Sequence, residues 1–127
     1  MVGVQAVTDS QVPNFDANDH ALVAQLLLDR YGHAVDLQDA DAELRLDPES
    51  STLTSCPTLY WCERSAHFVV NKLAPESFRA EFFYDDRQHF GCGIERFDDL
   101  RRCVLTLLRV QADHERDRAL HSHKDPI

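Results

Sequence analysis

The residues of this chain best suited to chemistry are its cysteines and histidines, and one pair lies in the stretch HFGCGIERF. Cys92 stands between two glycines there, three residues after His89. Residues three apart in a regular strand point to opposite faces of the sheet. The two side chains are therefore not expected to share a metal ion or to form a nucleophile–base pair. We predict that Cys92 is a small buried hydrophobic residue.

A second group, in the stretch CPTLYWCERSAH, allows a more direct pairing. If the chain turns within ERSA, Cys62 lies directly opposite His67 on the neighbouring antiparallel strand. Such a pair could supply half of a zinc site, or a thiolate that the imidazole activates. Zinc needs four ligands, so Cys56 would have to swing in from an expected loop, with His89 or His33 completing the set. This spacing matches no standard zinc finger or ribbon.

The composition argues against several classes of partner. The chain has 127 residues, 43% of them hydrophobic, which fits one domain over residues 1–127. Its 22 acidic residues outnumber 13 Lys and Arg, and the net charge of −9 opposes binding to nucleic acid or to anionic lipid. No apolar run approaches the roughly 18 residues of a membrane span. We expect neither a nucleic acid nor a membrane as partner.

Cysteine usage and the opening residues favour a cytoplasmic location. The N-terminal MVGVQAVTDSQ has no basic segment followed by a long apolar one, so it does not resemble a secretory signal. Four cysteines in a chain of this length do not form a typical disulfide framework. We expect free thiols in a reducing compartment. Phosphate-binding loops, nucleophile elbows and HExxH helices are missing from the sequence, which favours a binding protein over an enzyme.

Two helices are predicted, one near each end of the chain. Leucines with helical spacing in HALVAQLLLDRYG predict a helix over 17–31, capped by Asp16 or Asn18 and closed by Gly32. Apolar residues at i, i+3, i+4 and i+7, counted from Phe97, predict a second and longer helix with Asp98 as its N-cap. We expect residues 1–15 to form a loose arm and residues 114–127 to be frayed or disordered.

Between the helices the sequence favours strands. Alternation around Val35–Leu37 and Leu44–Leu46 predicts two short strands on either side of an acidic turn, DADA. Residues 47–57 have no periodicity and are expected to form a loop. Three runs rich in aromatic and β-branched residues then predict hairpin-connected strands, followed by HFGCGI. The order predicts an α+β fold: an antiparallel β-meander of four to five strands flanked by the two helices, in two layers.

The last hairpin can be given a trial register. With a three-residue loop over 86–88, Phe82 lies opposite Cys92 and Tyr84 opposite Phe90. One face of the hairpin then becomes apolar, with the residues Phe78, Ala80, Phe82, Tyr84, Phe90, Cys92 and Ile94. A slip by one residue would turn every side chain to the other face.

The aromatic residues of the strands are more than one sheet face needs. We expect some of them to form a binding surface, with Tyr60, Trp61, Phe68 and Phe83 as candidates, and homodimerisation is the usual way to cover such a surface. The alternative is that the two helices cover the sheet fully and leave no such surface. The leading hypothesis is a small acidic cytosolic protein-binding module, dimeric and taking a protein or peptide partner. The alternative is a metal-binding or thiol-dependent protein centred on Cys62 and His67, with zinc as the metal.

In size, acidic charge and its opening helix-then-strands order, the chain is similar to small acidic secretion chaperones, which are dimeric α+β proteins. That resemblance implies a chaperone-like binding module. The single long closing helix departs from the usual layout of that family. An adaptor, or an immunity-type inhibitor that sets acidic charge against a basic toxin, fits the same composition.

Overall fold

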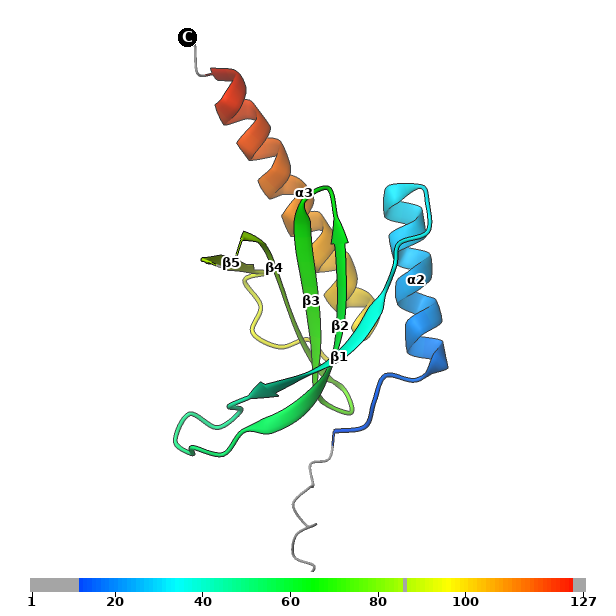
Figure 1. The fold of residues 1–127 in the computed structure, drawn as a ribbon, viewed down its shortest axis with the longest axis vertical. Helices are drawn as coiled ribbons and strands as arrows, with labels where there is room; N and C mark the ends of the chain where they lie inside the picture. The colour runs from blue at the N-terminus through cyan, green and yellow to red at the C-terminus, as the bar shows by residue number, and fades with distance from the viewer. Residues whose placement is uncertain (1–11, 86, 125–127) are drawn as a thin grey trace, which may run out of the picture.

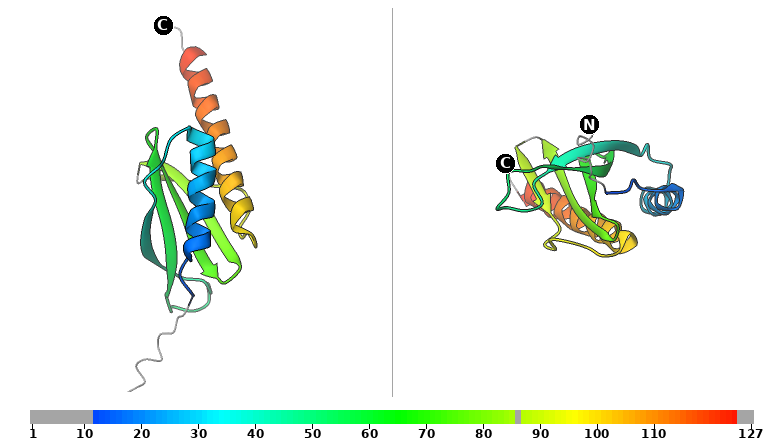
Figure 2. Two further views of the ribbon diagram at one scale, coloured as in Figure 1. Left: turned by 90° about the vertical axis from the view of Figure 1, so that its right-hand side faces the viewer. Right: turned by 90° about the horizontal axis from the view of Figure 1, so that it is seen from below.

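The computed structural model describes residues 12–85 and 87–124, with side chains as far as Leu120. Five antiparallel strands form one sheet in chain order, between an N-terminal and a C-terminal helix (Figure 1). Figure 2 shows both helices on the same side of the sheet, so the molecule has two layers. This confirms the predicted α+β meander. The elements are α2 (Ala17–Tyr31), β1 (Gln38–Leu44), β2 (Thr54–Glu63), β3 (Ala66–Ala74), β4 (Ser77–Asp85), β5 (Gln88–Gly91) and α3 (Leu100–Lys124).

Helix α2 has the predicted bounds because both of its ends are capped by its own sequence. The Asp16 side chain accepts a hydrogen bond from the Asp19 backbone N–H at 2.8 Å, and the Asp19 side chain accepts one from the Asp16 backbone N–H at 3.0 Å. Gly32 closes the helix in the left-handed conformation, with φ 79°. The residue before the cap, Phe15, is buried in the core, so the expected loose arm is anchored there. Residues 1–11 lie outside the described residues.

The register of the β2–β3 hairpin is the one that the sequence suggested. Cys62 pairs with His67, and Trp61 pairs with Phe68. The turn between them is made by Arg64 and Ser65, and both have positive φ angles. Two such residues in a two-residue loop match the twist of the strands on either side.

The β4–β5 hairpin differs from its predicted register by two residues. Phe82 lies opposite Phe90 rather than Cys92. One residue of this shift arises because Asp85 pairs with Gln88 across a loop of two residues instead of three, and the other arises from a bulge in β4. The ladder skips Tyr84, between the Phe83–His89 and Asp85–Gln88 pairs. This bulge compensates for the shorter loop, so the predicted apolar face is kept as far as Cys92. Ile94 was also predicted on that face, but it lies beyond the end of β5 and is 41% exposed.

Two segments that were expected to be irregular are strands. The supposed acidic turn DADA lies inside β1, a single strand whose carboxylates reach solvent along the sheet edge. The expected loop over 47–57 ends earlier, since β2 begins at Thr54 and includes Cys56 and Pro57. Pro57 pairs with Asp41 of β1 but precedes the first β2–β3 pair, at Thr58, so its missing N–H leaves that ladder intact.

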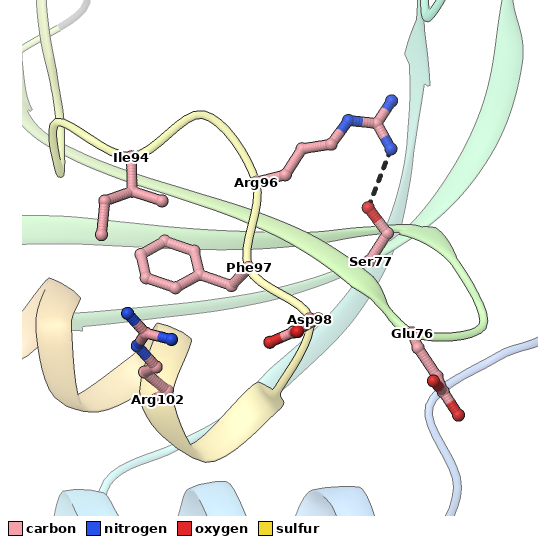
Figure 3. Close-up of a pocket in the computed structure, with 7 residues that line it drawn as sticks. All are labelled: Glu76, Ser77, Ile94, Arg96, Phe97, Asp98 and Arg102. Carbon is pink, nitrogen blue, oxygen red and sulfur yellow. Dashed lines mark hydrogen bonds between the residues drawn. The ribbon is translucent and has the colours of Figure 1, made fainter.

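The segment between β5 and α3 folds back along β4. Phe97 and Phe78 exchange two backbone hydrogen bonds of 2.8 Å, and Arg96 donates to the Ser77 hydroxyl at 2.9 Å (Figure 3). The N-cap of α3 is Asp99 rather than Asp98, because the Asp99 carboxylate accepts a hydrogen bond from the Arg102 backbone N–H at 2.9 Å.

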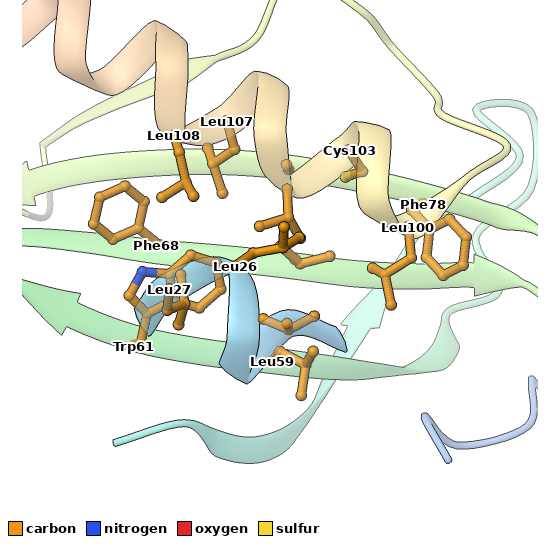
Figure 4. Close-up of a cluster of buried hydrophobic side chains, with 14 of the residues drawn as sticks. Leu26, Leu27, Leu59, Trp61, Phe68, Phe78, Leu100, Cys103, Leu107 and Leu108 are labelled. Atoms are coloured by element: carbon orange, nitrogen blue, oxygen red, sulfur yellow. The ribbon is translucent and has the colours of Figure 1, made fainter. Parts of the chain in front are cut away.

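The hydrophobic core lies between the helices and the covered face of the sheet (Figure 4). Leu26 and Leu27 of α2 and the apolar stripe of α3 pack onto β2, β3 and β4, where Trp61 and Phe68 stack with ring centroids 5.1 Å apart. The largest fully buried side chains are Trp61, Phe68, Phe82, Leu27, Leu59, Leu107, Val23, Val70, Val104, Cys56 and Cys103. The predicted stripe of α3 is buried throughout, including Gln111.

Helix α3 continues well past the end of its apolar stripe. The segment expected to be frayed from residue 114 is helical through Lys124, and residues 125–127 lie outside the described part. Contacts with the sheet explain why the prediction was wrong. The Arg118 guanidinium lies 4.1 Å from the centre of the Tyr84 ring, and Arg64 pairs with Glu115 at 3.6 Å.

Candidate functional site

The candidate site is the face of the sheet that neither helix covers, which we call the open face. Because side chains alternate along a strand, the residues next to Trp61 and Phe68 point away from the core. The strand pairings arrange them in three rows across the sheet. From β1 to β5 the rows are Ala40, Thr58, Asn71 and Arg79; Gln38, Tyr60, Val69, Glu81 and Gly91; and Cys62, His67, Phe83 and His89.

Four rings form a continuous stack across this face. His67 lies 4.9 Å from Phe83 and Phe83 lies 4.5 Å from His89, centroid to centroid, with interplanar angles of 12° for both pairs. Tyr60 adds a fourth ring, 5.9 Å from His67. His67, Phe83 and His89 are directly opposed on neighbouring strands, and Tyr60 is the diagonal neighbour of His67, so the strand register produces the stack. We call these four residues the ring ladder.

Hydrogen bonds hold both imidazoles of the ring ladder in place. The Tyr60 hydroxyl lies 2.6 Å from Nδ1 of His67. Nδ1 of His89 lies 2.9 Å from the Glu81 carboxylate, on the neighbouring strand. Each imidazole is thus oriented by a partner on the open face. The arrangement is a fixed apolar surface with polar atoms at its edges.

Two of the four predicted surface residues belong to this face and two do not. Tyr60 and Phe83 lie on the open face and are half-buried. Trp61 and Phe68 are fully buried against the helices, so their prediction as surface residues was wrong. The sequence reasoning missed His67 and His89 as members of the same surface and considered them only as metal ligands. Both histidines pair with Phe83 on the neighbouring strands, and this pairing places them on the open face.

The Cys62–His67 pair lies across the hairpin as predicted, but its surroundings do not complete a metal site. Cys62 is exposed, whereas Cys56 is fully buried and its thiol donates to the Thr54 carbonyl oxygen at 3.6 Å. His89 lies beyond Phe83 in the ring ladder. Within 12–85 and 87–124, no group of three or more His, Cys, Asp or Glu side chains could hold a metal ion. The zinc alternative lacks a third ligand there.

Burial explains the character of the other thiols. It raises the pKa of Cys92 to about 11 and the pKa of Cys103 to about 12. The pKa of Cys56 is raised as well, also by burial. Cys92 lies just beyond the end of β5, where it is half-buried and packs against the core, as predicted. A thiol with a pKa this high is largely protonated at neutral pH, so Cys92 is a packing residue.

Among the hollows outside the open face, two lie beside the helices. One, of about 320 Å³, mixes two arginines with two carboxylates and is lined by Glu76, Ser77, Ile94, Arg96, Phe97, Asp98 and Arg102 (Figure 3). The other, of about 450 Å³, is an apolar groove between the two helices, lined by Leu26, Asp29, Arg30, Leu105, Leu108, Arg109 and Ala112. Neither hollow contains a nucleophile with a neighbouring base.

No family model, curated protein or solved structure matches this chain. Function is therefore inferred from its own surfaces. Across the described ranges, neither helix is both long enough and apolar enough to cross a membrane.

Fixed charge is distributed very unevenly between the open face and the sheet edge. In the three rows of the open face, Arg79 and Glu81 are the residues with a fixed charge. Along β1, by contrast, Asp39, Asp41 and Glu43 alternate with small or apolar residues. The sequence contained this signal, since alternation of acidic and small residues over 39–43 is typical of a strand with one charged face.

Proposed function

We propose that this chain is a protein-binding module that works as a homodimer, and that two copies meet through their open faces. The observation that carries the proposal is the composition of that face. Antiparallel sheets with one solvated face usually show polar residues there. This face has polar residues as well, but it groups the ring ladder with Val69 and Cys62 at one end of the sheet.

Charge supports a second copy as the occupant. Two chains of net charge −9 repel each other wherever their carboxylates come close. The open face is a surface on which this repulsion is weak, because its one carboxylate, Glu81, is already bonded to His89 at 2.9 Å. A two-fold dimer repeats every contact, so a self-complementary surface of this kind is favoured.

The half-buried rings support the same conclusion. Aromatic residues are enriched in protein interfaces, where fixed rings bury large areas at a low cost in conformational entropy. Tyr60, His67 and His89 already have hydrogen-bond partners within the chain. Covering them therefore leaves few polar groups without a partner.

The state of the thiols supports the expected cytoplasmic location. All four cysteines are free, and Cys56 and Cys103 are buried. A reducing compartment keeps exposed thiols such as Cys62 from forming disulfides between chains.

Light scattering coupled to size exclusion tests the proposal. The wild-type chain is expected to have a mass of about twice the 14.5 kDa of one copy. Phe83→Lys and Val69→Lys each place a charge on the open face and are expected to give monomers at the same concentration. Lysine is expected to disfavour the dimer because its ammonium group would be buried in the interface without a partner.

Leu105→Lys is the matched control. Leu105 is 46% exposed on α3, on the other side of the sheet, so this variant keeps the dimer while adding the same charge. Circular dichroism establishes that all three variants fold. A monomeric wild-type chain across the accessible concentration range, or a dimer that only Leu105→Lys dissociates, contradicts the proposal.

A further inference from the structure

We infer that the free edge of β1 binds an extended basic segment of a partner protein as an additional strand of the sheet. The inference rests on the proposed function in one respect, that the chain binds proteins. It does not require a homodimer. It names the site and the chemistry of the partner, which the open face leaves undetermined.

The first observation is a long and regular sheet edge. β1 pairs with β2 through seven consecutive residue pairs without a bulge, and in the described ranges its other edge has no paired strand. All seven residues are exposed or half-buried. Sheet edges are usually protected by lysines, prolines, bulges or a short strand. β1 has none of these, although its carboxylates disfavour pairing with an acidic strand, and its backbone can accept a further strand.

The second observation is the charge of this edge. Residues 36–49 carry six carboxylates and one arginine, a net −5, which is more than half of the −9 of the whole chain. Such an edge repels an acidic strand, including a second copy of β1, and attracts a basic one. The charge therefore selects the partner, whereas the backbone supplies hydrogen bonds to any strand.

The spacing of the carboxylates fits an extended segment. Asp39, Asp41 and Glu43 follow one another at every second residue, so they share one face of β1 and lie roughly 7 Å apart along it. A strand with Lys or Arg at every second position has the same repeat. Asp41 and Glu43 make no hydrogen bond or ion pair with the described residues and remain available, whereas Asp39 is bonded to His20 at 2.8 Å.

The third observation is a hollow of about 320 Å³ beside the same edge. Its walls include the Phe15 ring and two of the β1 carboxylates, and its lining residues are Asn14, Phe15, His20, Asp39, Ala40, Asp41 and Pro57. Apolar walls next to carboxylates suit a long basic side chain, whose methylene stem packs while its cation meets Asp41. One basic residue of the added strand is therefore expected to enter this hollow.

A synthetic peptide tests the inference without knowledge of the natural partner. The probe is a fluorescent seven-residue peptide with lysine at alternate positions and threonine or valine between them. Fluorescence anisotropy at low ionic strength measures its binding to the full chain. A second peptide of the same composition, with its lysines contiguous, is the control for charge alone. We expect at least about threefold weaker binding for the control, because its cations do not match the repeat of β1.

Backbone pairing is tested with two further peptides, N-methylated at odd or at even positions. Methylation removes the N–H donors that a ladder needs, so one of the two is expected to lose binding. Hydrogen exchange on the complex is expected to protect amides within 38–44. If the contiguous peptide and both methylated peptides bind as tightly as the alternating peptide, the inference is wrong and the binding is a non-specific charge attraction.

Matched variants locate the site. Asp41→Asn combined with Glu43→Gln is expected to weaken binding of the alternating peptide by about threefold or more. Asp47→Asn combined with Glu49→Gln removes the same charge from the neighbouring loop and is expected to change binding by less than about twofold. Equal effects of the two pairs would count against an added strand at β1. Phe83→Lys separates the two proposals, because it is expected to abolish the homodimer while the peptide still binds.

Discussion

His20 links the first turn of α2 to the edge of the sheet. Its Nδ1 lies 2.8 Å from the Asp16 carbonyl oxygen and its Nε2 lies 2.8 Å from the Asp39 carboxylate. The Phe15 ring packs edge-on against the imidazole. The bond to Asp39, together with that to the Asp16 carbonyl, raises the pKa of His20 above its usual 6.5.

This link predicts a pH-dependent stability. A histidine with a raised pKa in the folded state stabilises the fold fully below the unfolded value of about 6.5, and the stabilisation is lost as the pH rises through the folded pKa. The groups that face His20 are Asp16, Asp19 and Asp39. We expect the stability difference between the wild type and His20→Gln to shrink between pH 6 and pH 8, as measured by urea unfolding. Asp39→Asn is expected to reduce the same dependence, and a constant difference would contradict this account.

The β2–β3 turn stores a small amount of backbone strain. Arg64 has φ 54° and Ser65 has φ 70°, a region that costs residues with a Cβ about 1 kcal/mol. Arg64 has compensating contacts, with Glu115 and with the Tyr31 ring. Ser65 is exposed, and no hydrogen bond of its side chain stabilises the turn.

Ser65→Gly is therefore expected to stabilise the fold, by about 1 kcal/mol. Urea unfolding measures the change. Ser51→Gly is the control: Ser51 is also exposed but has a negative φ, so glycine there is expected to be neutral or to destabilise by up to about 1 kcal/mol. The same sign of change at both positions would contradict the idea of strain at Ser65.

At the scale of elements, α3 offers two leucines in opposite environments. Leu107 is fully buried against the sheet and Leu105 is 46% exposed. We expect Leu107→Ala to lower the free energy of unfolding by about 2–5 kcal/mol, because it removes buried methyl groups and leaves a cavity. Leu105→Ala is expected to cost less than about 1 kcal/mol. Comparable losses at both positions, in denaturant unfolding, would mean that the buried face of α3 has been assigned incorrectly.

The helices could be predicted from the sequence because their signals are local. Asp16, the leucines of α2 and Gly32 all lie within one segment, so the periodicity and caps determine the bounds. Strand bounds depend on partners instead. Nothing local in TSCPT marks a strand, and Cys56 and Pro57 become part of β2 because β1 pairs with them.

The β4–β5 hairpin shows the same dependence on context. A two-residue loop, taken alone, would have moved Cys92 and Phe90 to the open face. The bulge at Tyr84 prevents this, and Tyr84 then packs against His114 of α3, with ring centroids 5.5 Å apart. The apolar face could be predicted because it must reach the core, whereas the loop length could not.

At the scale of the whole molecule, the candidate site could be predicted only in part. Tyr60 and Trp61 are neighbours of similar chemistry, and alternation places them on opposite faces. Which face the helices cover follows from long-range packing, so the sequence alone did not show that Tyr60 lies on the uncovered face and Trp61 in the core. The same uncertainty concealed the ring ladder, whose four members come from four different strands.

The uneven distribution of charge gives the molecule two surfaces with different selectivity. The open face carries the ring ladder among polar residues and has little fixed charge, and it is suited to a surface like itself. The edge of β1 carries carboxylates and is suited to an oppositely charged strand. Because the two surfaces do not share their principal residues, a homodimer would leave the edge of each copy accessible. Such a dimer would present two equivalent binding edges, which favours bivalent partners.

The exposure of one thiol among four has a practical consequence. Cys62 is exposed at the end of the row that contains Phe83, whereas the other three thiols are buried or half-buried. A maleimide dye should therefore attach to the wild-type chain at a single position, without engineered cysteines. Quenching or energy transfer from that dye would then report directly on whatever approaches the uncovered side of the sheet.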